Sequence, residues 1–117
     1  MSRDRTMEPL RTALRQLLDE QEMTDTELMA RADLSPATVS LYLSGKRGRR
    51  MNSQAIETVR RLAAALGVEP DYFLEYRIWR VQEIMRRCPE LVDDVYDFLV
   101  NAARVGGIID EAPQDSQ

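Results

Sequence analysis

Two helix-start signals that follow each other closely constrain this fold more than any other feature of the sequence. Thr24 and Glu27 match a capping box, in which the Thr24 hydroxyl accepts from the Glu27 amide and the Glu27 carboxylate reaches back. Ser35 and Pro36 form the second signal, an N-cap residue followed by proline at the first helical position. Asp33, which lies between the two signals, tolerates left-handed backbone and therefore allows a sharp turn there. The pattern predicts two helices joined by a turn of about three residues, a helix-turn-helix.

Apolar residues recur at helical spacing in the rest of the chain, and no run alternates in the way typical of a strand. A leucine stripe predicts a first helix that ends near Glu22: Leu10, Leu14, Leu17 and Leu18. A further helix is predicted over residues 54–66, followed by a short helix opened by Pro70. Two more are predicted after it, one that ends at Cys88 and one over residues 90–104. We expect an all-α protein with a five-helix domain over residues 1–75, two C-terminal helices over residues 76–106, and a disordered acidic tail over residues 107–117.

The charge of the chain is distributed unevenly. A formal net charge of −4 argues against a nucleic-acid binder when the chain is taken whole. Residues 35–61, however, carry six basic side chains and one acidic side chain, whereas residues 81–117 carry three basic and eight acidic ones. The first segment is the kind of local basic patch that nucleic acid selects, although a solvated basic loop explains the same charge.

Several classes of function lack the residues that they need. The sequence has no histidine, and its single cysteine, Cys88, forms neither an internal disulfide nor a zinc site. No glycine-rich phosphate loop or other catalytic constellation is present in the sequence, so we expect no enzyme, no metal and no cofactor. No apolar run approaches the length of a membrane span, and we expect a cytoplasmic protein with no membrane partner.

Two stretches of the sequence, TDTELMARADLSPATVSLYLSGKR and IETVRRLAAALGVEPDYFL, extend these observations. Over residues 8–75 they resemble the lambda-repressor-like, Cro-type (XRE) helix-turn-helix domain. The resemblance implies a sequence-specific regulator of transcription that binds double-stranded DNA, of the bacterial or phage repressor type, acting by operator occupancy. Asp25 stands where that family usually has a phosphate-contacting glutamine, Met29 and Asp33 replace a small alanine and a turn glycine, and the loop after residue 45 is longer than the family norm.

The resemblance implies that exposed residues at the start of the second helix of the helix-turn-helix contact the bases of the DNA. The candidates for base contact are Ser35, Pro36, Ala37, Thr38 and Leu41. None is an Arg, Asn or Gln that could make a bidentate base contact, so we expect hydrogen bonds from Thr38 and apolar contacts with thymine methyl groups. Leu41 has the alternative of covering the domain, as does Leu43, whereas Val39 and Tyr42 are expected in the core.

Most of the affinity for DNA is expected from the phosphate backbone. The candidates for phosphate contact are Ser40, Lys46, Arg47, Arg49 and Arg50. Arg49 or Arg50 has the alternative of entering a narrow minor groove. Arg3 and Arg5 could form a minor N-terminal arm, for which a frayed terminus is the simpler interpretation.

The two C-terminal helices carry more apolar residues than the domain needs to close its core. We expect them to form a homodimer. In it, the second helix of the helix-turn-helix of one copy would lie about 34 Å from that of the other copy on a palindromic site. The candidate dimerisation residues are Ile78, Trp79, Val81, Met85, Leu91, Val95, Phe98 and Leu99. Two alternatives stay open: the helices pack back on the domain, or they bind another protein, as in an antitoxin. Trp79, Tyr96 and Phe98 could also line a ligand pocket, although core packing is the simpler use of them.

Overall fold

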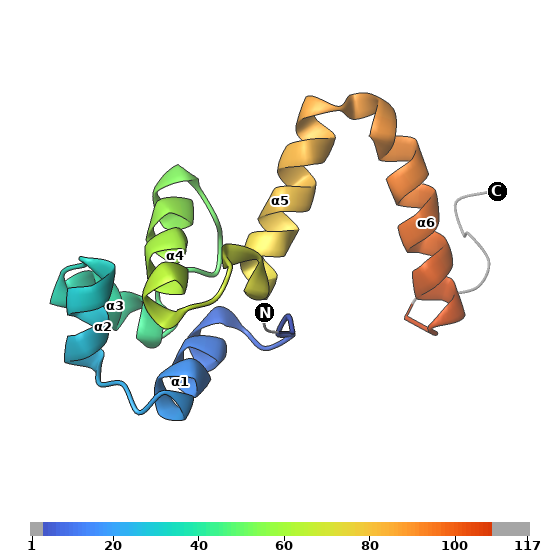
Figure 1. Cartoon of the computed structure of the whole chain (residues 1–117). Helices are drawn as coiled ribbons and strands as arrows, with labels where there is room; N and C mark the ends of the chain where they lie inside the picture. Colours follow the sequence, from blue (N-terminus) through green and yellow to red (C-terminus); the bar gives the residue numbers. More distant parts are fainter. Residues whose placement is uncertain (1–3, 109–117) are drawn as a thin grey trace. The chain divides into compact units, whose positions relative to one another are not determined.

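The computed structural model of the protein describes residues 4–108, and every regular element within that range is helical. Figure 1 shows the elements in chain order. The α-helices are α1 (Leu10–Glu20), α2 (Asp25–Ala32), α3 (Pro36–Leu43), α4 (Ser53–Leu66), α5 (Leu74–Arg87) and α6 (Val92–Val105). Two short 3-10 helices, η1 (Pro70–Tyr72) and η2 (Pro89–Leu91), precede α5 and α6. The predicted all-α fold class is confirmed.

The chain divides into two compact units, Met1–Val81 and Gln82–Gln117. We call them the N-terminal unit and the C-terminal unit and describe each by itself. The division lies inside α5, a few residues beyond the boundary at 75/76 that the sequence predicts. The predicted acidic tail lies outside the described residues from position 109 onward.

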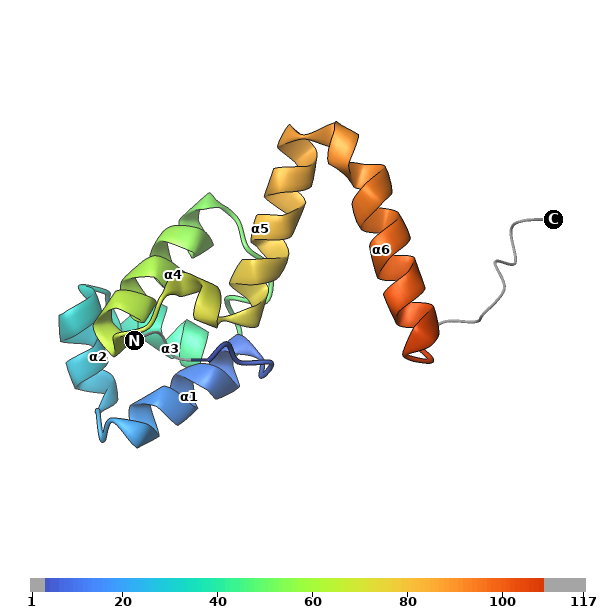
Figure 2. The ribbon, with the colours of Figure 1, turned by 45° about the vertical axis from the view of Figure 1, so that its right-hand side comes forward.

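The core of the N-terminal unit lies between the first four helices. Helix α2 packs against α4 and α3, and α3 packs against α1; Figures 1 and 2 show these four helices gathered together. The largest fully buried side chains are Leu14, Leu17, Leu18, Leu28, Val39, Val59, Leu62 and Phe73. Burial of these apolar side chains holds the helix-turn-helix in place, because a helix as short as α2 or α3 is not stable alone in water.

The helix-turn-helix itself forms as the sequence predicts. The Thr24 hydroxyl accepts a hydrogen bond from the Glu27 amide at 3.1 Å, and the Glu27 carboxylate accepts from the Thr24 amide at 2.9 Å. Asp33 adopts left-handed backbone, with φ 57° and ψ 51°, and Ser35 caps α3 ahead of Pro36. Arg61 of α4 donates a hydrogen bond to the Asp33 carbonyl at 3.1 Å. The turn is therefore fixed both by its own residues and by a side chain from another helix.

The capping box lowers the pKa of Glu27 below its ordinary value, chiefly through the hydrogen bond from the Thr24 backbone and then through the Thr24 hydroxyl. Because the folded-state pKa lies below the unfolded one, this stabilisation is present above the unfolded pKa and is lost as the pH falls through the folded value. We expect Thr24→Ala to raise the Glu27 pKa only partly, since the backbone donor remains. A carbon NMR titration of the side-chain carboxyl measures this, and an unchanged midpoint would contradict a role for the hydroxyl.

The helix boundaries differ most from the prediction in two places. The first helix ends at Glu20 rather than near Glu22, because Glu22 adopts a φ of 52° and turns the chain so that Met23 enters the core. The short helix predicted after Pro70 is the 3-10 turn η1, and Phe73 is extended after it. Helix α5 then runs without interruption, so the short fifth helix and the first C-terminal helix predicted from the sequence are replaced by a 3-10 turn and one long helix.

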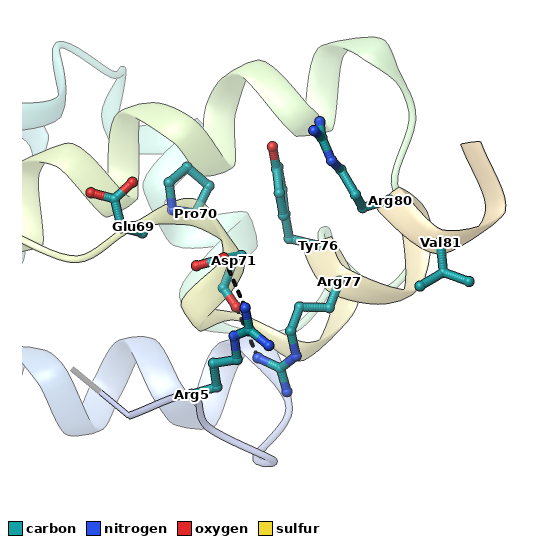
Figure 3. Close-up of a pocket in the computed structure, with 8 residues that line it drawn as sticks. All are labelled: Arg5, Glu69, Pro70, Asp71, Tyr76, Arg77, Arg80 and Val81. Carbon is teal, nitrogen blue, oxygen red and sulfur yellow. Dashed lines mark hydrogen bonds and ion pairs between the residues drawn. The ribbon is translucent and has the colours of Figure 1, made fainter. Parts of the chain in front are cut away.

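The N-terminal segment is tied to the start of α5. The Thr6 amide donates to the Tyr72 carbonyl at 3.1 Å, and the Arg77 guanidinium donates to the carbonyl oxygens of Thr6, Asp71 and Tyr72 at 2.7–2.9 Å. Arg5 forms an exposed ion pair with Asp71 at 3.3 Å. Figure 3 shows Arg5 and Arg77 reaching Asp71 at the side of a cleft of about 470 Å³. A frayed terminus is therefore wrong for Arg5, whereas Arg3 lies outside the described residues.

The described part of the C-terminal unit, residues 82–108, contains no buried residue. Pro89 ends α5 and opens η2, as the sequence predicts, and α6 follows directly. Tyr96 and Phe98 are 62% and 71% exposed, so they do not pack in a core within the C-terminal unit, contrary to the expectation. The reason is that no other element of the described part of that unit buries them. Its large apolar side chains remain available to a partner.

Candidate DNA-binding surface

Helix α3 presents a mixed polar and apolar surface at its N-terminal end. Ser35, Pro36, Ala37 and Ser40 are exposed, and Thr38 is half-buried. The Ser35 hydroxyl accepts from the Thr38 amide at 3.1 Å and donates to the Thr38 hydroxyl at 2.9 Å. Ser35 thus uses its hydroxyl to cap the helix, whereas the Thr38 hydroxyl still has its own hydrogen to donate. Thr38 is the better placed of the two for a base edge.

The opposite side of α3 belongs to the core. Val39 is fully buried and Tyr42 is 3% exposed, which confirms the prediction for both. Leu43 is partly buried and packs against the core cluster, as its covering role predicts. Leu41 is also half-buried and lies on the helix between Ser40 and Tyr42.

The loop between α3 and α4 is anchored to the core at two points. Gly48 is buried, has a φ of +93°, and lies so close to α1 that a Cβ added there would be 2.5 Å from Leu10 Cδ2 and 3.1 Å from Tyr42 Cδ2. Met51 packs against the core a few residues later. The basic residues of this loop predict its charge but neither of these two anchors. A glycine between two runs of basic residues is the one local sign that the chain approaches another element there.

The basic side chains of this loop have no ion-pair partner among residues 4–108, and all of them are exposed: Lys46, Arg47, Arg49 and Arg50. Other arginines of the same unit are occupied. Arg15 pairs with Asp25 at 3.1 Å, and Arg61 pairs with Glu57 at 3.3 Å and braces Asp33. Within residues 35–61, the positive charge of the loop is therefore available to bind a phosphate. The positive charge of α4 is partly neutralised by Glu57.

A cleft of about 260 Å³ lies between the α3–α4 loop, helix α3 and the start of α4. It is lined from α3 by Thr38 and Tyr42, from the loop by Arg47 and Arg50, and from α4 by residues of its first turns. The Asn52 side chain caps α4 by accepting from the Ala55 amide at 2.8 Å, a cap that is not among the predicted ones. The cleft therefore combines loop cations with the positive end of a helix, both of which favour an anion.

The predicted dimerisation residues differ in how far they are exposed. Met85 and Val95 are half-buried, and the exposed members are Ile78, Val81, Leu91, Phe98 and Leu99. Trp79 differs from all of them, because it packs against the core of the N-terminal unit with its ring 5.7 Å from that of Tyr76. Trp79 is therefore better explained as a core residue than as part of a dimer surface.

No helix within residues 4–108 is long and apolar enough to cross a membrane. In the same range, no group of three or more Cys, Asp and Glu residues is arranged to hold a metal ion.

Comparison with known proteins gives one positive result. The family model for the Cro/C1-type helix-turn-helix DNA-binding domain matches residues 13–77, more than half of the chain. No curated protein and no solved structure matches the chain. The matched range contains the capping box of α2, the exposed face of α3, the basic loop and helix α4. On this evidence the chain belongs to the Cro/C1-type helix-turn-helix DNA-binding family.

Proposed function

We propose that this protein is a sequence-specific transcription regulator that represses genes by occupying an operator as a homodimer. The observation that carries the proposal is the coincidence of an exposed α3 face with a loop of four unpaired cations inside a matched DNA-binding domain. The dimensions of the major groove admit a helix such as α3, and the loop that follows would lie beside the sugar–phosphate backbone. A DNA-binding regulator of this type would act in the bacterial cytoplasm.

The proposed base contacts come from Thr38, Ala37 and Leu41, supported at the helix start by Ser35 and Pro36. Thr38 would donate its hydroxyl hydrogen to a base edge, while Ala37 and Leu41 would contact thymine methyl groups. Phosphate contacts are proposed for Ser40 and for the loop cations. Because α3 presents no Arg, Asn or Gln, we propose that DNA shape and phosphate geometry supply a large share of the specificity.

The proposed dimer forms through the C-terminal unit. Leu91, Val95, Phe98, Ala102 and Val105 follow one another at alternating spacings of four and three residues, the spacing of an apolar seam between two packed helices. All except Val95 are exposed in the single chain. A second copy of the same seam would bury them symmetrically, as homodimer interfaces do.

Phe98, a member of this seam, and Leu99, its neighbour on α6, provide the test of this dimer, since they are 71% and 53% exposed in the single chain. Replacing both with Asp should weaken dimerisation at least about 100-fold, because losing the burial of two large apolar side chains costs about 3–6 kcal/mol. Light scattering at tens of micromolar should then find a dimer for the wild type and a monomer for the variant. Asn101→Asp, an exposed position on the polar side of α6, is the matched control and should remain dimeric.

The same exposed seam favours a second candidate function, an antitoxin-type protein whose C-terminal helices bind another protein while the helix-turn-helix controls its own gene. The two candidates differ in the state of the isolated protein. A wild-type monomer at tens of micromolar would contradict the homodimer and favour the second candidate.

Selection of bound sites from random duplex DNA tests the proposed function as a whole. A regulator of this kind should enrich a palindromic motif with half-sites about one helical turn apart. Binding without enrichment, with strong dependence on salt, would contradict sequence specificity and indicate an architectural DNA-binding protein instead.

A further inference from the structure

A third cleft in the N-terminal unit, of about 570 Å³, lies between the start of α1 and the α3–α4 loop. Three arginines line it: Arg11 from α1, and Arg47 and Arg49 from the loop. All three are exposed, and none forms an ion pair with another residue of the described chain. The cleft therefore concentrates positive charge that the protein itself does not neutralise.

The loop backbone holds Arg11 in this cleft. A Cβ added to Gly45 would lie 2.7 Å from Arg11 Cδ, so the aliphatic part of Arg11 runs directly along the Gly45 backbone. Gly48 packs on Leu10, the neighbour of Arg11 on α1. These two contacts keep the start of α1 in register with the basic loop, and bring an arginine distant in sequence next to Arg47 and Arg49.

The one acidic residue that lines the cleft is Glu75. Its Oε2 accepts a hydrogen bond from the Leu10 amide at 2.9 Å, so the carboxylate caps the start of α1. Its Oε1 is buried and has no hydrogen-bond partner in the described chain. One carboxylate against three guanidinium groups leaves the cleft with an excess of positive charge, and the free oxygen can accept from a water molecule that accompanies a ligand.

We propose that this cleft binds a phosphate group and that Arg11 is one of its ligands, a contact that lies outside the helix-turn-helix. The proposal rests on the proposed function in one respect: the expected phosphate belongs to the DNA backbone. Arg47 lines both this cleft and the one that contains Thr38, so the loop forms a wall of both clefts. A backbone that passes Thr38 and Arg47 would therefore reach Arg11. The same chemistry would also accept a free phosphate or pyrophosphate.

The test compares Arg11→Gln with Arg80→Gln, an exposed arginine on α5 that does not line this cleft. The first measurement is the salt dependence of binding to the selected DNA. Loss of one phosphate contact should make the log–log slope shallower by about 0.9 for Arg11→Gln and leave it unchanged for Arg80→Gln. The second measurement is thermal unfolding in pyrophosphate without DNA, which also shows that both variants fold.

The outcomes separate the cleft from the proposed function. A shallower slope for Arg11→Gln alone supports a DNA phosphate in the cleft. An unchanged slope with loss of pyrophosphate stabilisation in Arg11→Gln supports the cleft and assigns it to a free phosphate. If Arg11→Gln matches Arg80→Gln in both measurements, the phosphate cleft is overturned. A wild-type protein that binds no DNA contradicts the proposed function, while the pyrophosphate measurement still tests the cleft.

Discussion

Replacing Arg47, Arg49 and Arg50 with alanine together should remove most of the salt-dependent DNA affinity of this protein. These three side chains are exposed and have no ion-pair partner within the described chain, so each is available to neutralise a phosphate. Each lost contact releases about 0.9 fewer counterions, and the log–log slope of affinity against salt should become shallower by about 2.7 for three contacts. Fluorescence anisotropy with the selected duplex at several salt concentrations measures the slope.

A control must remove the same charge from another place. Arg80, Arg86 and Arg87 are exposed arginines of α5, and the last two already pair with Glu83. Changing these three to alanine alters the net charge equally but should leave the slope within experimental error. If the loop variant and the control lose affinity equally, a general charge effect explains the result and the loop is not the phosphate-binding element.

Gly48→Ala should lower the free energy of unfolding of the N-terminal unit by about 2–5 kcal/mol. Two costs add at this position. The φ of +93° is strained for a residue with a Cβ, at about 1–2 kcal/mol. The added methyl group would also lie 2.5 Å from Leu10 Cδ2 in a packed region, and overpacking of that kind costs about 1–3 kcal/mol. Urea unfolding followed by circular dichroism measures the change.

Gly67→Ala separates the two costs. Gly67 also has a positive φ, +73°, but nothing lies within 4 Å of a Cβ added there. This variant should lose only about 1–2 kcal/mol, the cost of the backbone strain. Equal losses for the two variants would contradict the close contact between the loop and α1. Because that contact also positions Arg47 and Arg49, Gly48→Ala should weaken DNA binding in addition, whereas Gly67→Ala should not.

The starts and ends of α2 and α3 could be predicted from sequence because their determinants are local. The Thr24 capping box, the left-handed Asp33 and the Ser35 cap each involve residues within a few positions of one another. The cap of α4 by Asn52 is equally local, but it lies in a loop whose basic residues are its dominant sequence feature, and it is not among the predicted caps. The continuity of α5 through Trp79 was not predicted, because it depends on which side of that helix the core of the N-terminal unit occupies.

In the candidate site, too, features with local determinants can be predicted from sequence, whereas features that depend on distant contacts cannot. The basic loop and the polar start of α3, which we propose to bind DNA, are visible in the sequence. Which arginines remain available is not, because pairing depends on side chains that come from elsewhere in the chain. Arg61 is occupied by Glu57 and the Asp33 carbonyl, and Arg77 by three carbonyl oxygens of η1 and the N-terminal segment. Arg11, which no local pattern singles out, lines a cleft with the loop arginines.

The fold class, the helix-turn-helix and the family can therefore be predicted from sequence, since capping and apolar spacing act over a few residues and leave a pattern that can be recognised along the chain. Folding in three dimensions sets which charges are free, where the basic loop is anchored, and which apolar residues of α5 and α6 stay uncovered. These properties depend on contacts between residues far apart in the sequence, such as Gly48 with Leu10 and Glu75 with the Leu10 amide. The net charge of −4 is a sum over the chain, whereas DNA binding depends on the local charge that folding leaves unpaired.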